Sequence, residues 1–239
     1  LSVFISCNSN EDIKDDEQST KTEKIEAKHY EIVKISIPTV VKDEEYSITL
    51  NDQTINGASP FDGELYFIVP NDAKIGLGKL KIPKLSYEAN INISNISLSN
   101  TPDAIITDYI NLLYNADILS TNTPGSQDIK HNIDNFKEIF NKSNTEEKLQ
   151  IASLYQANQS LFNSIAAIKV PEPKGIVMDD VEEAALIRIS AVSAHVLAVT
   201  TSAIMYKVPN HLPKIKFPLA ITAGIAYGTS IILNDQFIT

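Results

Sequence analysis

The sequence predicts an α+β protein in which a small β-sandwich is followed by an α-helical module. Between residues 29 and 99, short apolar runs alternate with polar residues at a period of two, and clusters of Gly, Pro, Asn and Asp separate them. From residue 100 onward, apolar residues recur at spacings of three and four, as they do on one face of a helix. With 239 residues, 43% of them apolar, the chain is long enough to bury a core in each part.

The charge balance excludes one class of partner. Twenty Lys and Arg residues stand against thirty Asp and Glu residues, which gives a net charge of −10. Such an excess of negative charge opposes binding to phosphate backbones, so nucleic acid is not expected as a partner. The chain has one cysteine, which excludes a disulfide within it.

The amino terminus reads LSVFISC, a short apolar run that ends in a small residue and then Cys7. This run resembles the end of a bacterial lipoprotein signal peptide, with Ser6 before the cleavage point, although Phe4 and Ile5 depart from the usual Leu-Ala or Leu-Ser pattern. The resemblance implies that residues 1–7 are the end of a signal peptide and that Cys7 is lipidated, which would attach the chain to a membrane. The alternative is a buried apolar amino terminus with a chance cysteine.

Residues 8–28 combine low hydrophobicity with many charges, and this composition predicts a disordered acidic tether. Acidic residues directly after a lipidated cysteine are similar to the export signal of some Bacteroidota lipoproteins. That similarity implies an outer-membrane protein on the periplasmic or cell-surface face. Plain linker composition explains the same residues equally well.

Six strands are expected in the domain at residues 29–99, and Pro38, Pro60, Pro70 and Pro83 stand at their proposed ends or breaks. The expected strands are 30–37, 46–50, 53–55, 64–69, 78–82 and 86–93.

Residues 50–82, LNDQTINGASPFDGELYFIVPNDAKIGLGKLKI, resemble the later half of an IPT/TIG-type immunoglobulin-like (Ig-like) domain. Glu64 to Val69 would be the apolar strand of that family, Pro70 its stop, and Gly76 or Gly78 the glycine of the following loop. The resemblance implies an Ig-like sandwich. Because residues 35–41 lack the glycine-rich turn of the family, an ordinary Ig-like sandwich is an equal alternative.

The helical module at residues 100–239 is expected to begin with a helix capped by Thr101 and Pro102. Further helical stripes follow at 133–140 and 145–165, and residues 169–178 form a proline-broken connector. The segments 181–208 and 217–233 are the most apolar, and small residues recur in them at every fourth position. These small residues are Ser190, Ala194, Ala198 and Ser202 in the first segment, and Ala220, Gly224 and Gly228 in the second. Such rows allow close approach of backbones and predict a buried apolar helical hairpin.

No arrangement in the sequence predicts catalysis, a metal or a cofactor. The four histidines lack metal-ligand spacing, and neither HExxH, GxSxG nor a glycine-rich phosphate loop occurs. His195 interrupts an apolar stretch and is expected to be a hydrogen-bonded core residue, with a switch or a ligand as the alternative. The acidic residues 179–183 fit a helix start better than a calcium site.

The aromatic residues Tyr66, Phe67 and Tyr87 are the candidates for ligand contact, since exposed rings can stack on sugars. Alternation along a strand would place Tyr66 and Phe67 on opposite faces, so one of the two should point outward.

The favoured function is a non-enzymatic, lipid-anchored cell-envelope protein that binds a partner protein or an extracellular polymer such as a glycan. The alternative is a membrane-active protein, pore-forming or bacteriocin-like, that inserts segments 189–206 and 217–233. Both segments are near the minimum length that crosses a bilayer, but six Ser, Thr and His residues in the first make insertion marginal. An enzyme of unfamiliar type is a third hypothesis, without a residue arrangement to support it.

Overall fold

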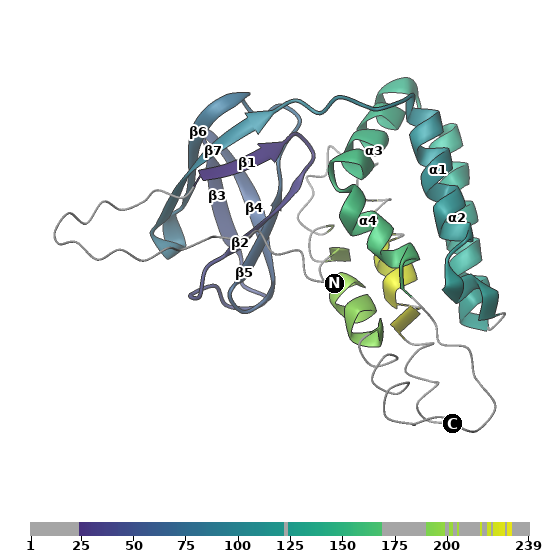
Figure 1. Cartoon of the computed structure of the whole chain (residues 1–239). Coiled ribbons are helices and arrows are strands. Elements are labelled where there is room, and N and C mark those ends of the chain that lie inside the picture. The colour runs from purple at the N-terminus through teal and green to yellow at the C-terminus, as the bar shows by residue number, and fades with distance from the viewer. Residues whose placement is uncertain are drawn as a thin grey trace, which may run out of the picture.

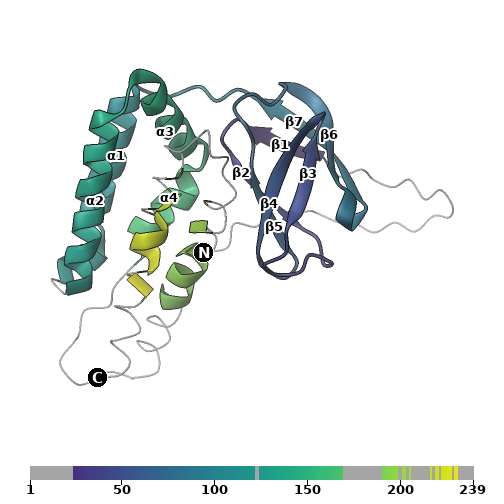
Figure 2. The same cartoon turned by 180° about the vertical axis from the view of Figure 1, so that it is seen from behind.

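The computed structural model describes residues 24–121 and 124–168 and parts of the remaining chain, namely 190–198, 201–202, 205, 216, 219–220, 222–227 and 229–230. Seven strands come first and helices follow, so the prediction of a mixed protein with β and α parts is confirmed. The sheet and the helices lie side by side, with α3 and α4 between the sheet and α1 and α2 (Figure 1; seen from behind in Figure 2).

All seven strands belong to one mixed sheet with the order β1-β7-β6-β3-β4-β5-β2. The pairing of β1 with β7 is parallel, and the other neighbours are antiparallel. The strands are β1 (Lys24–Lys28), β2 (Ile32–Ser36), β3 (Tyr46–Leu50), β4 (Gln53–Phe61), β5 (Glu64–Ile68), β6 (Gly76–Ile82) and β7 (Tyr87–Ser94), and the 3-10 turn η1 (Pro83–Leu85) joins the last two.

Strand β4 links the two halves of the sheet. It pairs with β3 along its first part and with β5 along its second, and the register shifts between Ala58 and Phe61. Such an irregularity bends a strand, and the sheet curls like a barrel around its apolar face. The expected sandwich of two Ig-like sheets is therefore not confirmed. Side chains that fill the core of the sheet include Tyr46, Ile48, Leu50, Leu65, Phe67, Leu80, Ile82 and Ile91.

Strand β1 corrects the prediction for the amino-terminal segment. The acidic tether was expected to reach residue 28, but Lys24–Lys28 pairs with β7 along its whole length. The charged side chains of β1 are exposed, while Ala27 packs in the core of the sheet. Two apolar residues among five are enough for a strand that lies at the edge of an existing sheet. Cys7 and the rest of the tether lie outside the described residues.

The helices begin at clear capping residues. Helix α1 (Pro102–Tyr114) starts with the Thr101 hydroxyl accepting from the Ala104 amide at 3.3 Å, as expected. Helix α3 (Thr145–Ala157) begins at the expected residue 145, and Asn144 caps it: the Asn144 side chain accepts from the Glu147 amide, and the Glu147 carboxylate accepts from the Asn144 amide. Between them lie η2 (Asp117–Thr121) and α2 (Pro124–Lys142). Helix α4 (Gln159–Ala166) completes the series, so the expected helix 145–165 is divided at Asn158.

A second core lies among the helices. The rings of Tyr109, Tyr155 and Phe162 are packed with centroid distances between 4.5 and 5.8 Å. The described parts of the C-terminal segments join this core through Leu197, Ala198, Leu219, Ile225 and Ala226.

The predicted rows of small residues are placed only in part. Ala194 and Ala198 are buried, as close packing requires. At Gly224, in contrast, there is room for a methyl group, since the nearest atom to it would be the Asn132 amide nitrogen of α2 at 3.8 Å. His195 is exposed, which corrects the expectation of a core residue, because it lies at the margin between the buried and the exposed face of helix 190–198. No helix among the described residues is both long and apolar enough to span a membrane.

Candidate functional site at the seam between the sheet and the helices

A bulge at the start of β2 directs part of the sheet backbone toward the helices. Tyr30 adopts a left-handed conformation with φ of 66°. The Tyr30 amide donates to the Val69 carbonyl at 2.9 Å, and the Val69 amide donates to the Glu31 carbonyl at 2.9 Å. Tyr30 and Glu31 thus both oppose Val69, and two residues opposite one is the pairing of a β-bulge. As a result, the Tyr30 carbonyl points away from β5.

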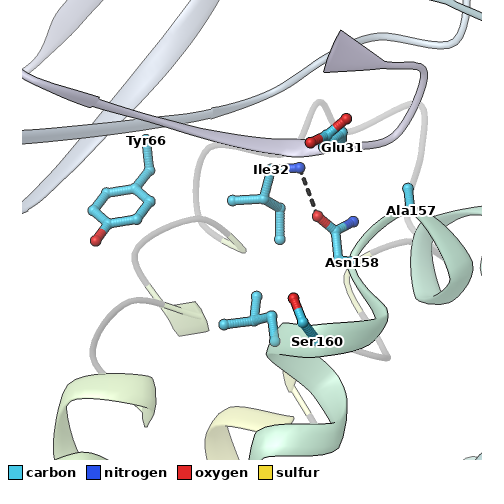
Figure 3. A pocket seen from close by; sticks show the side chains of 7 residues that line it. Glu31, Ile32, Tyr66, Ala157, Asn158 and Ser160 are labelled. Carbon is cyan, nitrogen blue, oxygen red and sulfur yellow. Dashed lines mark hydrogen bonds between the residues drawn. The ribbon is translucent and has the colours of Figure 1, made fainter. Parts of the chain in front are cut away.

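Asn158, between α3 and α4, binds the backbone exposed by this bulge. Its Oδ1 accepts from the Ile32 amide at 2.7 Å, and its Nδ2 donates to the carbonyls of Tyr30 and Leu154, both at 2.8 Å. The residue is 6% exposed, so these bonds are largely shielded from water. The amide of Asn158 therefore occupies the position that a neighbouring strand would take beside β2 (Figure 3).

Apolar packing and a second amide complete the contact, which we call the seam. Gln156 of α3 accepts from the Ser99 amide at 2.8 Å and from the Ser99 hydroxyl at 2.9 Å. Side chains of the sheet and its connector that pack against the helical core are Tyr30, Ile32, Tyr66, Ile68 and Leu98.

Two hollows open along the seam between the described parts of the sheet and the helices. The first, which we call the β2 pocket, has a volume of about 170 Å³ (Figure 3). Its lining consists of Glu31, Ile32, Tyr66, Ala157, Asn158, Ser160 and Leu161. The second has a volume of about 360 Å³ and lies beside His29, Tyr30 and Leu98 on the sheet side and Leu149 and Ser153 on α3. Pockets for drug-sized ligands hold about 300–1,000 Å³, so the β2 pocket is sized for a single side chain.

Polar groups on the strand surface beside the β2 pocket are linked to one another. Lys34 donates to Glu64 at 2.6 Å, and the Tyr66 hydroxyl donates to the same carboxylate at 2.6 Å. Burial raises the pKa of Glu64, but the hydrogen bonds from Lys34 and Tyr66 outweigh it, so the pKa lies below its ordinary value. Glu64 is therefore ionised at neutral pH and holds the Lys34 side chain over β5.

His29 lies in the wall of the larger hollow. It is buried, and its Nε2 is 2.8 Å from the Ala73 carbonyl oxygen, which orients the ring. Beside it, burial raises the pKa of the Tyr30 phenol above its ordinary value. The Tyr30 phenol is hydrogen-bonded to Asn71 and lies near the carboxylates of Asp72 and Glu146. His29 is held by a backbone carbonyl, so the contacts of both side chains are structural.

The three aromatic residues predicted to contact a ligand do not share a surface. Phe67 is 1% exposed and fills the core of the sheet, while Tyr87 packs at the edge of that core. Tyr66 points to the opposite face, as the alternation predicted, but it lines the β2 pocket and packs against the helices. Of the three, Tyr66 alone lies at the candidate site. Cys7, the predicted lipidation site, lies outside the described residues.

Sequence reasoning missed Asn158, which organises the seam. The signal was present, because an asparagine in the middle of a helical pattern favours a break where its amide can bind backbone groups. The partner of that amide could not be read from the sequence, since Ile32 is 126 residues away.

Within the part of the chain that the structure describes, no three His, Cys, Asp or Glu side chains are grouped as ligands for a metal. Comparison of the sequence with protein-family models and with curated proteins finds no match.

Proposed function

We propose that this chain is a non-enzymatic protein of the cell envelope, anchored to an outer membrane by lipid on Cys7, which binds a partner protein or an extracellular polymer. The observation that carries the proposal is the position of β1. The described fold begins at Lys24, so residues 8–23 separate Cys7 from the first strand. Sixteen residues can span at most about 55 Å, a reach sufficient to hold the folded body clear of lipid headgroups.

The strand order supports the finer proposal that the sheet is an Ig-like sandwich, of the IPT/TIG type or an ordinary one. The neighbours β2-β5-β4 and β3-β6-β7 correspond to the B-E-D and C-F-G orders of that fold. Domains of this architecture commonly present binding surfaces outside cells. The joined helices extend that surface through the seam.

The packing of the C-terminal segments supports a binding protein over the membrane-active alternative. Insertion of 189–206 and 217–233 would place Leu197, Ala198 and Ile225 in lipid, whereas these side chains belong to the helical core. Release of dye from liposomes by the Cys7→Ser chain would favour the alternative.

Fractionation of cells that express the full precursor tests the anchor. Cys7→Ser removes the thiol that would carry the lipid, and we expect the variant to leave the membrane fraction. Ser9→Ala is the matched control and should stay with the membrane like the parent chain. A Cys7→Ser chain that still sediments with membranes after a high-salt wash would exclude the lipid anchor, because several acyl chains hold a lipoprotein firmly and a bare chain has none.

A further inference from the structure

The outer edge of β2 presents backbone groups for pairing. In an antiparallel pair, alternate residues direct their amide and carbonyl toward the neighbour or away from it. The Ile37 amide donates to the Gly63 carbonyl at 2.9 Å, and with the register of β2 and β5 this places Val33 and Ile35 toward β5. Lys34 and Ser36 therefore point their amides outward, as does Ile32, whose amide binds Asn158.

Asn158 binds only the first outward-facing backbone groups of this edge. It binds the Tyr30 carbonyl and the Ile32 amide, and helix α4 begins at the next residue, Gln159. The next outward groups are the Ile32 carbonyl, the amide and carbonyl of Lys34, and the Ser36 amide. Among the described residues, no backbone or side-chain group bonds to these four. Open edges of this kind are templates for an added strand.

Charged side chains often protect an edge strand from pairing with another chain, but the Lys34 side chain does not extend over this edge. Its ammonium binds Glu64 at 2.6 Å and lies 5.8 Å from the centre of the Tyr66 ring, over β5 and not over the open side. The β2 pocket lies on the same face, beside Ile32 and Tyr66 (Figure 3). Leu161 of α4 also lines it. A strand added to β2 would thus have an apolar hollow for one of its alternate side chains.

We propose that β2 binds an extended peptide of a partner protein as an additional strand, with one aliphatic side chain of the peptide in the β2 pocket. This inference rests on the proposed function and specifies its partner. A second copy of the chain fits less well, because antiparallel pairing of two β2 edges about Lys34 sets Ser36 of the second copy opposite Ile32, and serine has no aliphatic side chain to fill the β2 pocket.

A random peptide display library, selected on the full Cys7→Ser chain, tests this inference. Ser36→Pro removes an amide that makes no bond inside the sheet and fills the space beside it, so the fold is retained while pairing is blocked. Ser36→Ala keeps the amide and is the matched control. Ser160→Phe, a change at the exposed wall of the β2 pocket, tests the pocket separately. Thermal melting of each variant monitors the fold.

We expect selected peptides that carry an aliphatic residue and slow amide hydrogen exchange at Lys34 and Ser36. Affinity should fall by about tenfold or more in Ser36→Pro, since several hydrogen bonds are lost together, and stay unchanged in Ser36→Ala. Ser160→Phe should weaken the selected peptides too. Peptides that bind Ser36→Pro equally well, or that leave both amides unprotected, would overturn the inference. Protection of these amides in a dimer of the free chain would also overturn it. Cys7 takes no part in this assay, so the anchor and the peptide site can fail separately.

Discussion

A single side-chain amide can join two modules because it carries both a donor and an acceptor. Asn158 uses its oxygen for the Ile32 amide and its nitrogen for the Tyr30 carbonyl, so it satisfies backbone groups on either side of Glu31. Aspartate could not donate, and an aliphatic residue could do neither. Buried backbone groups without partners are costly, and the identity of residue 158 is therefore tightly constrained.

We expect Asn158→Ala to destabilise the chain by about 2 kcal/mol, since it leaves an amide and a carbonyl unpaired in a largely buried place. Urea denaturation of the Cys7→Ser chain measures the loss. Ser160→Ala, an exposed neighbour on α4, is the control and should change the free energy of unfolding very little. A loss below about 0.5 kcal/mol in Asn158→Ala would mean that water replaces the amide and that the seam is held by apolar packing alone.

Among the elements, those with a strong apolar period were predictable and those that depend on context were not. Strand 46–50 has the expected bounds, and α1 begins at the expected cap. Strand β4 was expected to end at residue 55 but continues through Pro60 to Phe61, because the shift in its pairing with β5 accommodates a residue without an amide donor. Helix α2 begins at Pro124, well before the helical stripe expected at 133–140, since proline suits the first turn of a helix.

The helices around the C-terminal segments allow a test of the rows of small residues. Ala198 is buried in the helical core, so Ala198→Leu should overpack it and cost about 1–3 kcal/mol. Val196→Leu, on the exposed side of the same helix, is the matched control.

Gly224 should respond in the opposite direction. The nearest atom to an added methyl group is the Asn132 amide nitrogen at 3.8 Å, an ordinary contact distance. Gly224→Ala should therefore increase the free energy of unfolding by up to about 1 kcal/mol through helix propensity, and the melting temperature should rise. For Ala198→Leu, a melting temperature equal to that of the parent chain would contradict close packing of the row of small residues that contains Ala198.

In the whole molecule, two separate cores are joined by a narrow contact. Among the residues that the structure describes, the core of the sheet and the core of the helices share no buried side chain. The link between them is the set of half-buried residues at the seam. The sequence predicted both parts because each has its own period. It could not predict their arrangement, because Ile32, Tyr66 and Ile68 look like ordinary strand residues until the helices cover them. For the same reason the candidate site was foreseen only at Tyr66.

This arrangement predicts how the chain unfolds. Ile68 lies on the helix-facing side of β5, and Ile68→Asp places a carboxylate against the helical core without entering the core of the sheet. We expect calorimetry to give one transition for the Cys7→Ser parent and two for Ile68→Asp, since each core is apolar enough to melt as a unit once the seam is broken. Leu77→Asp, at a side chain 72% exposed on β6, should keep the single transition. Two transitions in the parent chain itself would mean that the seam does not couple the sheet to the helices. A single transition in Ile68→Asp would mean that this coupling does not depend on the apolar contact of Ile68.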